Sequence, residues 1–158
     1  MDKIDYDILK LLQRNSRQKA SSISESVHLS VSAVIERIRK MEREGIIQAF
    51  TIKLDYKKLG YDMSAYIGVT LEHPNNYDEF INKISNMESV ISCNYVTGEF
   101  DFLLVIMTTS TEGLEKVHRE IKMIKGVMGI KTFFVLSNIK DDNKKLLINP
   151  MQNYVDGK

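Results

Sequence analysis

The stretch that decides the fold reads LSVSAVIERIRKMEREG and spans residues 29–45. Its apolar residues recur every three or four positions, which places them on one face of a helix. They are Val31, Val34, Ile35, Ile38 and Met41. Ser30 is well placed as the N-cap of this helix, and Gly45 suits the left-handed conformation that ends many helices. We therefore expect an amphipathic helix between Ser30 and Gly45.

Two further amphipathic helices are expected before it. Residues 3–14 carry apolar side chains at helical spacing, namely Ile4, Ile8, Leu11 and Leu12, with Leu9 widening the stripe. Residues 20–27 keep Ile23 and Val27 four positions apart. Three helices with a tight turn between the second and the third are the outline of a helix-turn-helix. We expect this domain, winged-helix-like in type, to occupy residues 1–50.

The other face of the third helix is polar and basic. Residues 8–40 hold seven lysines and arginines against two glutamates, although the whole chain has a net charge of only +1. Small residues near a helix N-terminus let the backbone approach base edges, and cations further along can meet phosphates. Alternatively, this is a solvated helix with i,i+4 ion pairs, but its place as the third of three helices favours DNA. The expected DNA-binding residues are Arg17, Ser30, Ser32, Ala33, Glu36, Arg37 and Lys40.

The same residues resemble the Lrp/AsnC (feast/famine) family of bacterial and archaeal regulators, in particular its leucine-responsive branch. The resemblance rests on Leu29-Ser30-x-Ser32, on Glu36-Arg37-Ile38-Arg39-Lys40-Met41-Glu42, on Gly45-Ile46-Ile47-Gln48 and on Asn15-x-Arg17. Ala49-Phe50 replaces the usual Gly-Tyr, and Ser22-Ile23-Ser24 stands where Glu-Leu-Ala is common. The resemblance covers nearly the whole chain, and it implies a βαββαβ regulatory domain after the helix-turn-helix.

The residues of the C-terminal two-thirds predict that domain independently. The apolar set Tyr77, Phe80, Ile81, Ile84 and Met87 is repeated 37 residues later by Leu114, Val117, His118, Ile121 and Ile124. Both sets indicate amphipathic helices. Asn76-x-x-Glu79 and Thr109-x-x-Glu112 are candidate capping boxes at their starts, and Gly126 is the expected end of the second.

Strand-like segments flank both helices. They are residues 63–71, the alternating Ile91, Cys93 and Tyr95, residues 102–107 and residues 130–136. The order βαββαβ predicts a ferredoxin-like sheet, so the whole chain is of the α+β class. The continuously apolar run at 102–107 implies that both faces of the sheet are covered. We expect another subunit to supply the second cover, in a homodimer that assembles to a tetramer or octamer.

The remaining segments complete the expected organisation. Residues 46–54 are rich in β-formers and are interpreted as a strand that leaves the first domain, or as an extra edge strand of the second. The connector is expected at residues 51–61, the second domain at 62–150 with a last short strand at 145–150, and a tail at 151–158.

Gly98-Glu-Phe-Asp101 is expected to be a hairpin turn, in which Gly98 takes a positive φ and Asp101 caps the backbone. The family resemblance adds that a Gly-x-x-Asp at this hairpin lies between dimers where amino-acid effectors bind. It implies an effector site at Thr97, Gly98, Glu99, Phe100 and Asp101. Backbone N–H groups would hold the ligand carboxylate, and Asp101 would pair with its ammonium.

Several other classes are disfavoured. The sequence holds no phosphate-binding loop or nucleophile elbow, and its three histidines are each 45 residues apart, so we expect no enzyme, metal or cofactor. The single cysteine, Cys93, is interpreted as a small buried hydrophobe. No apolar run approaches the roughly 20 residues that span a bilayer, and the N-terminus lacks the pattern of a signal peptide, so we expect a cytoplasmic protein.

Two alternatives stay open. A βαββαβ fold also occurs in RNA-binding domains, but those need stacking aromatics on the third strand, where residues 102–107 offer mainly aliphatics. A constitutive DNA-organising protein without an effector would have the same two domains.

Overall fold

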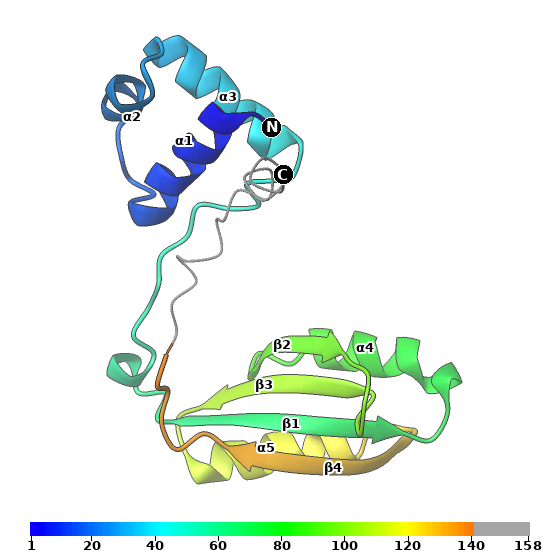
Figure 1. Cartoon of the computed structure of the whole chain (residues 1–158). Helices are drawn as coiled ribbons and strands as arrows, with labels where there is room; N and C mark the ends of the chain where they lie inside the picture. Colours follow the sequence, from blue (N-terminus) through cyan, green and yellow to red (C-terminus); the bar gives the residue numbers. More distant parts are fainter. Residues whose placement is uncertain (141–158) are drawn as a thin grey trace, which may run out of the picture. The chain divides into compact units, whose positions relative to one another are not determined.

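The computed structural model describes residues 1–140 of the chain. They fall into two compact units, residues 1–53 and residues 54–139, which are treated separately below (Figure 1). The last strand expected at 145–150 and the tail expected at 151–158 lie outside the described residues. The domain bounds given above therefore remain predictions.

The first unit consists of the three expected helices, α1 (Lys3–Arg14), α2 (Ala20–Val27) and α3 (Val31–Arg43). One core joins them, and its buried side chains are Ile8, Leu12, Ile23, Val34 and Met41. The caps also agree with the sequence, because the Ser30 hydroxyl accepts from the Ala33 N–H and Gly45 has a φ of 71°. The helix-turn-helix is therefore confirmed.

The turn between α2 and α3 is tight because one residue adopts a left-handed conformation. His28 has φ 55° and ψ 43°, and its N–H donates to the Ser24 carbonyl. It is the only non-glycine residue with positive φ in the part of the chain that the structure describes. A side chain in this region is strained, so the turn keeps its geometry through the packing on either side.

The prediction of a strand at residues 46–54 is wrong for the single chain. No strand occurs in the described chain before β1, and the segment exposes Ile46, Phe50, Ile52 and Leu54. A strand exists only when a neighbour accepts its backbone hydrogen bonds, and none of the described residues does so here. A short 3₁₀ turn, η1 (Lys57–Leu59), is the regular element that follows.

The second unit has the expected βαββαβ order. Its elements are β1 (Met63–Leu71), η2 (Pro74–Asn76), α4 (Tyr77–Ser85), β2 (Val90–Tyr95), β3 (Phe102–Thr108), α5 (Thr111–Lys122) and β4 (Val127–Phe134). The strands form one antiparallel sheet in the order β2-β3-β1-β4. The α+β class and the ferredoxin-like arrangement are therefore confirmed.

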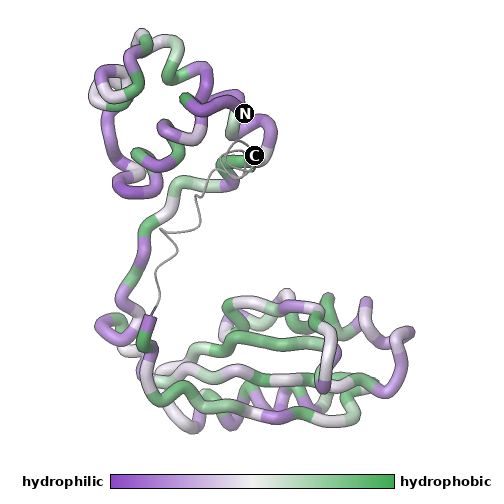
Figure 2. The backbone as a smooth tube through the Cα atoms, viewed as in Figure 1, coloured by the Kyte–Doolittle hydropathy of each residue, from purple (hydrophilic) through white to green (hydrophobic). Residues whose placement is uncertain are grey.

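Both helices pack on one face of the sheet. Alternate residues of β1 and β3 share a core with Phe80 and Ile84 of α4 and with Val117 and Ile121 of α5. Figure 2 shows hydrophobic residues concentrated along the strands of this unit. The 37-residue repeat thus reflects two helices with the same structural role.

The details of the helix ends differ from the sequence prediction. Asn76 makes no side-chain cap at α4, and Ser110 rather than Thr109 caps α5 by accepting from the Gly113 N–H. Gly126 has a φ of 83°, but α5 already ends at Lys122. When neighbouring residues such as Thr109 and Ser110 can both cap a helix, the sequence does not show which of them does so, because the choice depends on the path of the backbone.

No helix among the described residues covers the other face of the sheet. Tyr66 pairs in register with Val105 and Phe133, and Gly68 pairs with Leu103, so these residues share the face opposite the helices. Tyr66 and Phe133 are exposed. We call the set Tyr66, Leu103, Val105, Met107 and Phe133 the open sheet face.

The interpretation of Cys93 as a buried residue is wrong, because the structure exposes it. Ile91 and Tyr95 on the same strand are exposed too. All three lie on β2, an edge strand that the helices cover only in part. Within residues 1–140, no helix is both long enough and apolar enough to cross a bilayer.

Candidate nucleic-acid interface and effector loop

The N-terminal turn of α3 presents small polar side chains. The hydroxyls of Ser30 and Ser32 lie 3.1 Å apart, and both residues are exposed. Ala33 is half-buried. A molecule that approaches the first turn of α3 therefore meets small polar side chains.

Charged side chains occupy the outward face further along α3. Arg43 Nη2 donates to Glu36 Oε1 at 2.8 Å, and this hydrogen bond together with the positive charge lowers the pKa of Glu36. Lys40 lies 3.8 Å from Glu44 and is exposed. Exposed pairs of this kind are weak and exchange readily for other partners. The cations remain available to phosphates.

Arg37 differs from the other cations because its guanidinium is turned towards α1. Its Nη1 donates to Asp2 Oδ2 and to Asp5 Oδ1, both at 2.7 Å. The two carboxylates also form the capping box of α1, in which each accepts from the other's backbone N–H. The same interactions lower the pKa of Asp2 and raise the pKa of Arg37. Sequence reasoning missed this contact between segments more than thirty residues apart.

Five of the seven expected DNA-binding residues are exposed, in two groups, whereas Ala33 is half-buried and Arg37 is turned towards α1. Ser30, Ser32, Glu36 and Lys40 lie together on the exposed surface of α3. Arg17 is exposed in the loop between α1 and α2, where its backbone N–H donates to Asn15 Oδ1 at 3.0 Å.

Two residues of the predicted apolar face of α3 are exposed on its surface. Val31 is 42% exposed and Ile35 is 37% exposed, whereas Val34 is fully buried. The apolar stripe of α3 is therefore wider than the core of the first unit requires.

The hairpin between β2 and β3 has the expected turn geometry. Gly98 has a φ of 133°, which glycine tolerates best. Asp101 caps the backbone, because its Oδ2 accepts from the Leu71 N–H at 2.7 Å. Its Oδ1 accepts from the Tyr77 hydroxyl at 2.6 Å, which raises the pKa of Tyr77 to about 12. Both carboxylate oxygens of Asp101 therefore already have donors within the chain.

The other hairpin residues reach across the open sheet face. The Phe100 ring lies over Gly68, where a Cβ atom would come within 2.5 Å of the ring. It contacts Phe133 at a centroid distance of 6.1 Å, and Lys131 lies 5.7 Å from its centroid. Glu99 forms an ion pair with Lys131, while Thr97 is exposed. The hairpin is thereby tied to β1 and β4.

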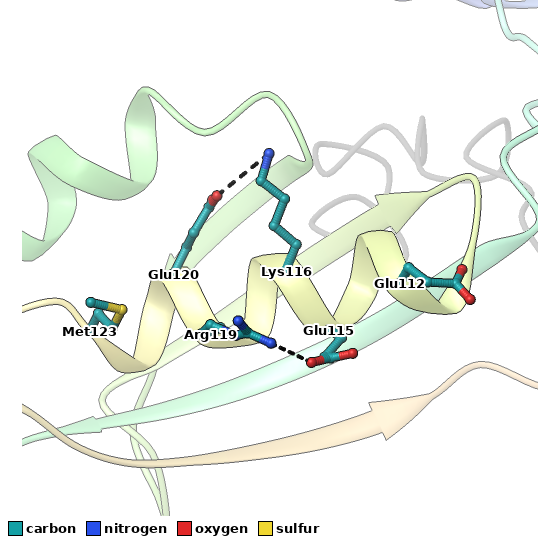
Figure 3. Close-up of a pocket in the computed structure, with 6 residues that line it drawn as sticks. All are labelled: Glu112, Glu115, Lys116, Arg119, Glu120 and Met123. Carbon is teal, nitrogen blue, oxygen red and sulfur yellow. Dashed lines mark hydrogen bonds and ion pairs between the residues drawn. The ribbon is translucent and has the colours of Figure 1, made fainter.

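A shallow hollow of about 250 Å³ lies on the outer surface of α5 (Figure 3). Its lining is charged, and its cations pair with acidic residues of the same helix, Lys116 with Glu120 and Arg119 with Glu115. It contains no nucleophile with a neighbouring base. No group of three or more potential metal ligands occurs in the described part of the chain. This hollow is a solvated helix face.

The capped third helix with its exposed cations, joined in one chain to a separate α/β unit, defines a helix-turn-helix DNA-binding regulator. Residues 1–48 match the family profile described as winged helix-turn-helix DNA-binding, and residues 64–144 match the profile described as Lrp/AsnC ligand binding domain. The chain belongs to the Lrp/AsnC family.

Individual relatives agree with this assignment. An uncharacterized HTH-type transcriptional regulator of Pyrococcus horikoshii is 32% identical over 143 residues, 90% of this chain and 95% of that protein. The leucine-responsive regulatory protein of Escherichia coli K12 is 29% identical over 150 residues, 93% of this chain and 92% of that protein. A Neisseria meningitidis transcriptional regulator, solved in complex with L-methionine, has a TM-score of 0.85 at 29% identity and covers 91% of this chain and 95% of its own.

Proposed function

We propose that this chain controls transcription by placing α3 in the major groove of specific double-stranded DNA, and that an amino acid or a related metabolite modulates this binding. The exposed outward face of α3, with its capped small-residue start and its cations, is the observation that carries the proposal. A regulator of chromosomal DNA would act in the cytoplasm.

In this proposal, different residues of the first unit contact the bases and the phosphates of the DNA. Ser30, Ser32 and Ala33 let the helix approach base edges, and Glu36 can accept from an exocyclic amine. Lys40 meets a phosphate on the α3 side, and Arg17 meets one from the loop before α2. Arg37 serves the same interface by holding α3 against α1.

The second unit joins copies of the chain. The open sheet face exposes aromatic side chains that a monomer would leave in water. A second copy that brings the same face would bury them in an isologous interface. We propose a homodimer of this kind, with further assembly to tetramers or octamers, so that paired α3 helices reach successive major grooves.

The effector site is proposed at residues 97–101. The complex of the Neisseria meningitidis regulator with L-methionine supports an amino-acid effector, and the family resemblance is what points to this hairpin as its place. Because both Asp101 oxygens already accept hydrogen bonds, Asp101 would either exchange a donor for the ligand ammonium or hold the loop in shape.

The test begins with duplexes that the full chain selects from a random library. Specific binding should be enriched, should weaken steeply with salt, and should change when the twenty amino acids are added singly. Lys40→Ala should weaken binding, while the matched control Lys125→Ala, on the second unit, should not. The proposal fails if no sequence is enriched at low ionic strength. The effector part fails if no amino acid alters affinity, sedimentation or the thermal midpoint.

A further inference from the structure

The first turns of α3 carry two apolar side chains that the core does not use. Val31 and Ile35 are both exposed, and neither belongs to the buried cluster of the first unit. They are four residues apart, so they are neighbours on the helix surface. Together they form a small apolar patch beside Ser32.

The surroundings of this patch indicate which partner it suits. The first turn of α3 has no acidic residue, and exposed Arg39, Lys40 and Arg43 follow further along the helix. Arg43 pairs with Glu36 and Lys40 lies near Glu44, but these exposed pairs are weak, so a polyanion can compete for the cations. The patch thus lies at the uncharged start of a helix whose remaining exposed surface is charged, with Arg39, Lys40 and Arg43 interspersed with glutamates.

In a helix-turn-helix, the N-terminal residues of the third helix contact base edges in the major groove. Thymine is the base that presents a methyl group there, next to its O4 acceptor. Valine and isoleucine on a helix hold one preferred χ1 rotamer, so their methyl groups are already ordered before binding. Val31 and Ile35 are therefore suited to contact an apolar group that has a fixed position, such as the methyl group of a thymine in a duplex.

We propose that Val31 and Ile35 read thymine methyl groups in the operator and so contribute to its sequence specificity. This inference rests on the proposed function, because it requires α3 to lie in the major groove. The two residues add apolar readout to the polar and charged contacts of the neighbouring side chains.

The test removes methyl groups from one side of the contact at a time, first from the DNA and then from the protein. A duplex selected by the full chain from a random library is resynthesised with each thymidine in turn replaced by deoxyuridine, which removes the base methyl alone. We expect the wild-type chain to lose about fourfold in affinity at one or two positions, the contribution of burying one methyl-sized group.

Ile35→Ala should bind the intact duplex at least fourfold more weakly and should no longer respond to deoxyuridine at its own position. Val31→Ala should lose the response at a different position. Ile35→Val, which removes one methyl group and keeps a branched side chain, provides a milder second variant. Ile81→Ala is the matched control, because Ile81 is 43% exposed and lies on α4 of the second unit.

Two results separate this inference from the proposed function. If a sequence is enriched but Ile35→Ala and Val31→Ala respond to every deoxyuridine as the wild type does, the apolar readout is overturned and the regulator remains. The apolar readout is also overturned if either variant changes the sedimenting mass, since the patch would then be a contact between subunits. If no sequence is enriched, the proposed function itself fails.

Discussion

Arg37 Nη1 lies 2.7 Å from Asp5 Oδ1, so a side chain of the third helix is hydrogen-bonded to the first turn of the first helix. The Asp5 side chain is only 13% exposed, which limits competition from water. Arg37 reaches Asp2 from the same nitrogen. This contact ties α3 to α1. Arg37, which the sequence assigns to DNA binding, therefore has a structural role as well.

Arg37→Ala should therefore destabilise the first unit by about 1–2 kcal/mol, because it leaves a largely buried carboxylate without its charged partner. It should also weaken DNA binding, but the slope of log affinity against log salt should stay near that of the wild type. Lys40→Ala should reduce this slope by about 0.9, the value for one lost phosphate contact. Urea unfolding and salt titrations of DNA binding measure the two effects. A reduced slope in Arg37→Ala would show that Arg37 contacts a phosphate directly.

His28→Gly should stabilise the chain. The left-handed conformation of His28 costs an ordinary side chain about 1 kcal/mol, and glycine avoids that cost but loses some of the gain to chain entropy. We expect a net gain of about 0.5 kcal/mol in the free energy of unfolding. His73→Gly, at an extended residue outside the first unit, is the control and should not stabilise. Equal effects in the two variants would contradict this explanation.

The elements with local signals were predictable from the sequence. Ser30 caps α3, and the 37-residue spacing of α4 and α5 is periodic enough to place both helices. Contacts distant in the chain were not predictable, such as Arg37 with Asp2. The segment 46–54 has the composition of a strand, but strand formation depends on a neighbour that composition does not reveal.

The candidate site shows the same division. The periodicity of α3 placed Ser32, Glu36 and Lys40 on the outward face, but it also placed Val31 and Ile35 on the apolar face, and both are exposed. The periodic pattern shows which residues of α3 are apolar. How many of them are buried depends on how α1 and α2 pack against α3. Cys93 was misassigned for a related reason, because alternation does not show that β2 is a partly covered edge.

Gly68→Ala should disturb the hairpin that carries the proposed effector residues. Its Cβ would lie 2.5–2.7 Å from three atoms of the Phe100 ring, so the ring must move off β1. We expect a loss of about 1–3 kcal/mol in stability, the range for overpacking. Gly129→Ala is the control, since a Cβ there meets nothing within 4 Å. Truncation of the ring in a Gly68→Ala/Phe100→Ala double variant should cancel part of the penalty, and strictly additive losses would contradict the contact.

Tyr77 should remain protonated at a pH where an ordinary tyrosine ionises. Its hydroxyl donates to Asp101, and the hydrogen bond and negative charge raise its pKa from 10 to about 12. A raised pKa means that the hydrogen bond stabilises the fold fully below pH 10 and is lost as the pH rises through 12. Ultraviolet titration of tyrosinate, compared between the wild type and Tyr77→Phe, isolates this group among the seven tyrosines. In Asp101→Asn the acceptor is neutral, so the pKa of Tyr77 should fall back towards 10, whereas Tyr61→Phe should leave the late step in place. If Tyr77 already ionises near pH 10 in the folded wild type, the Asp101 carboxylate is free of Tyr77 in solution and becomes available to a ligand ammonium.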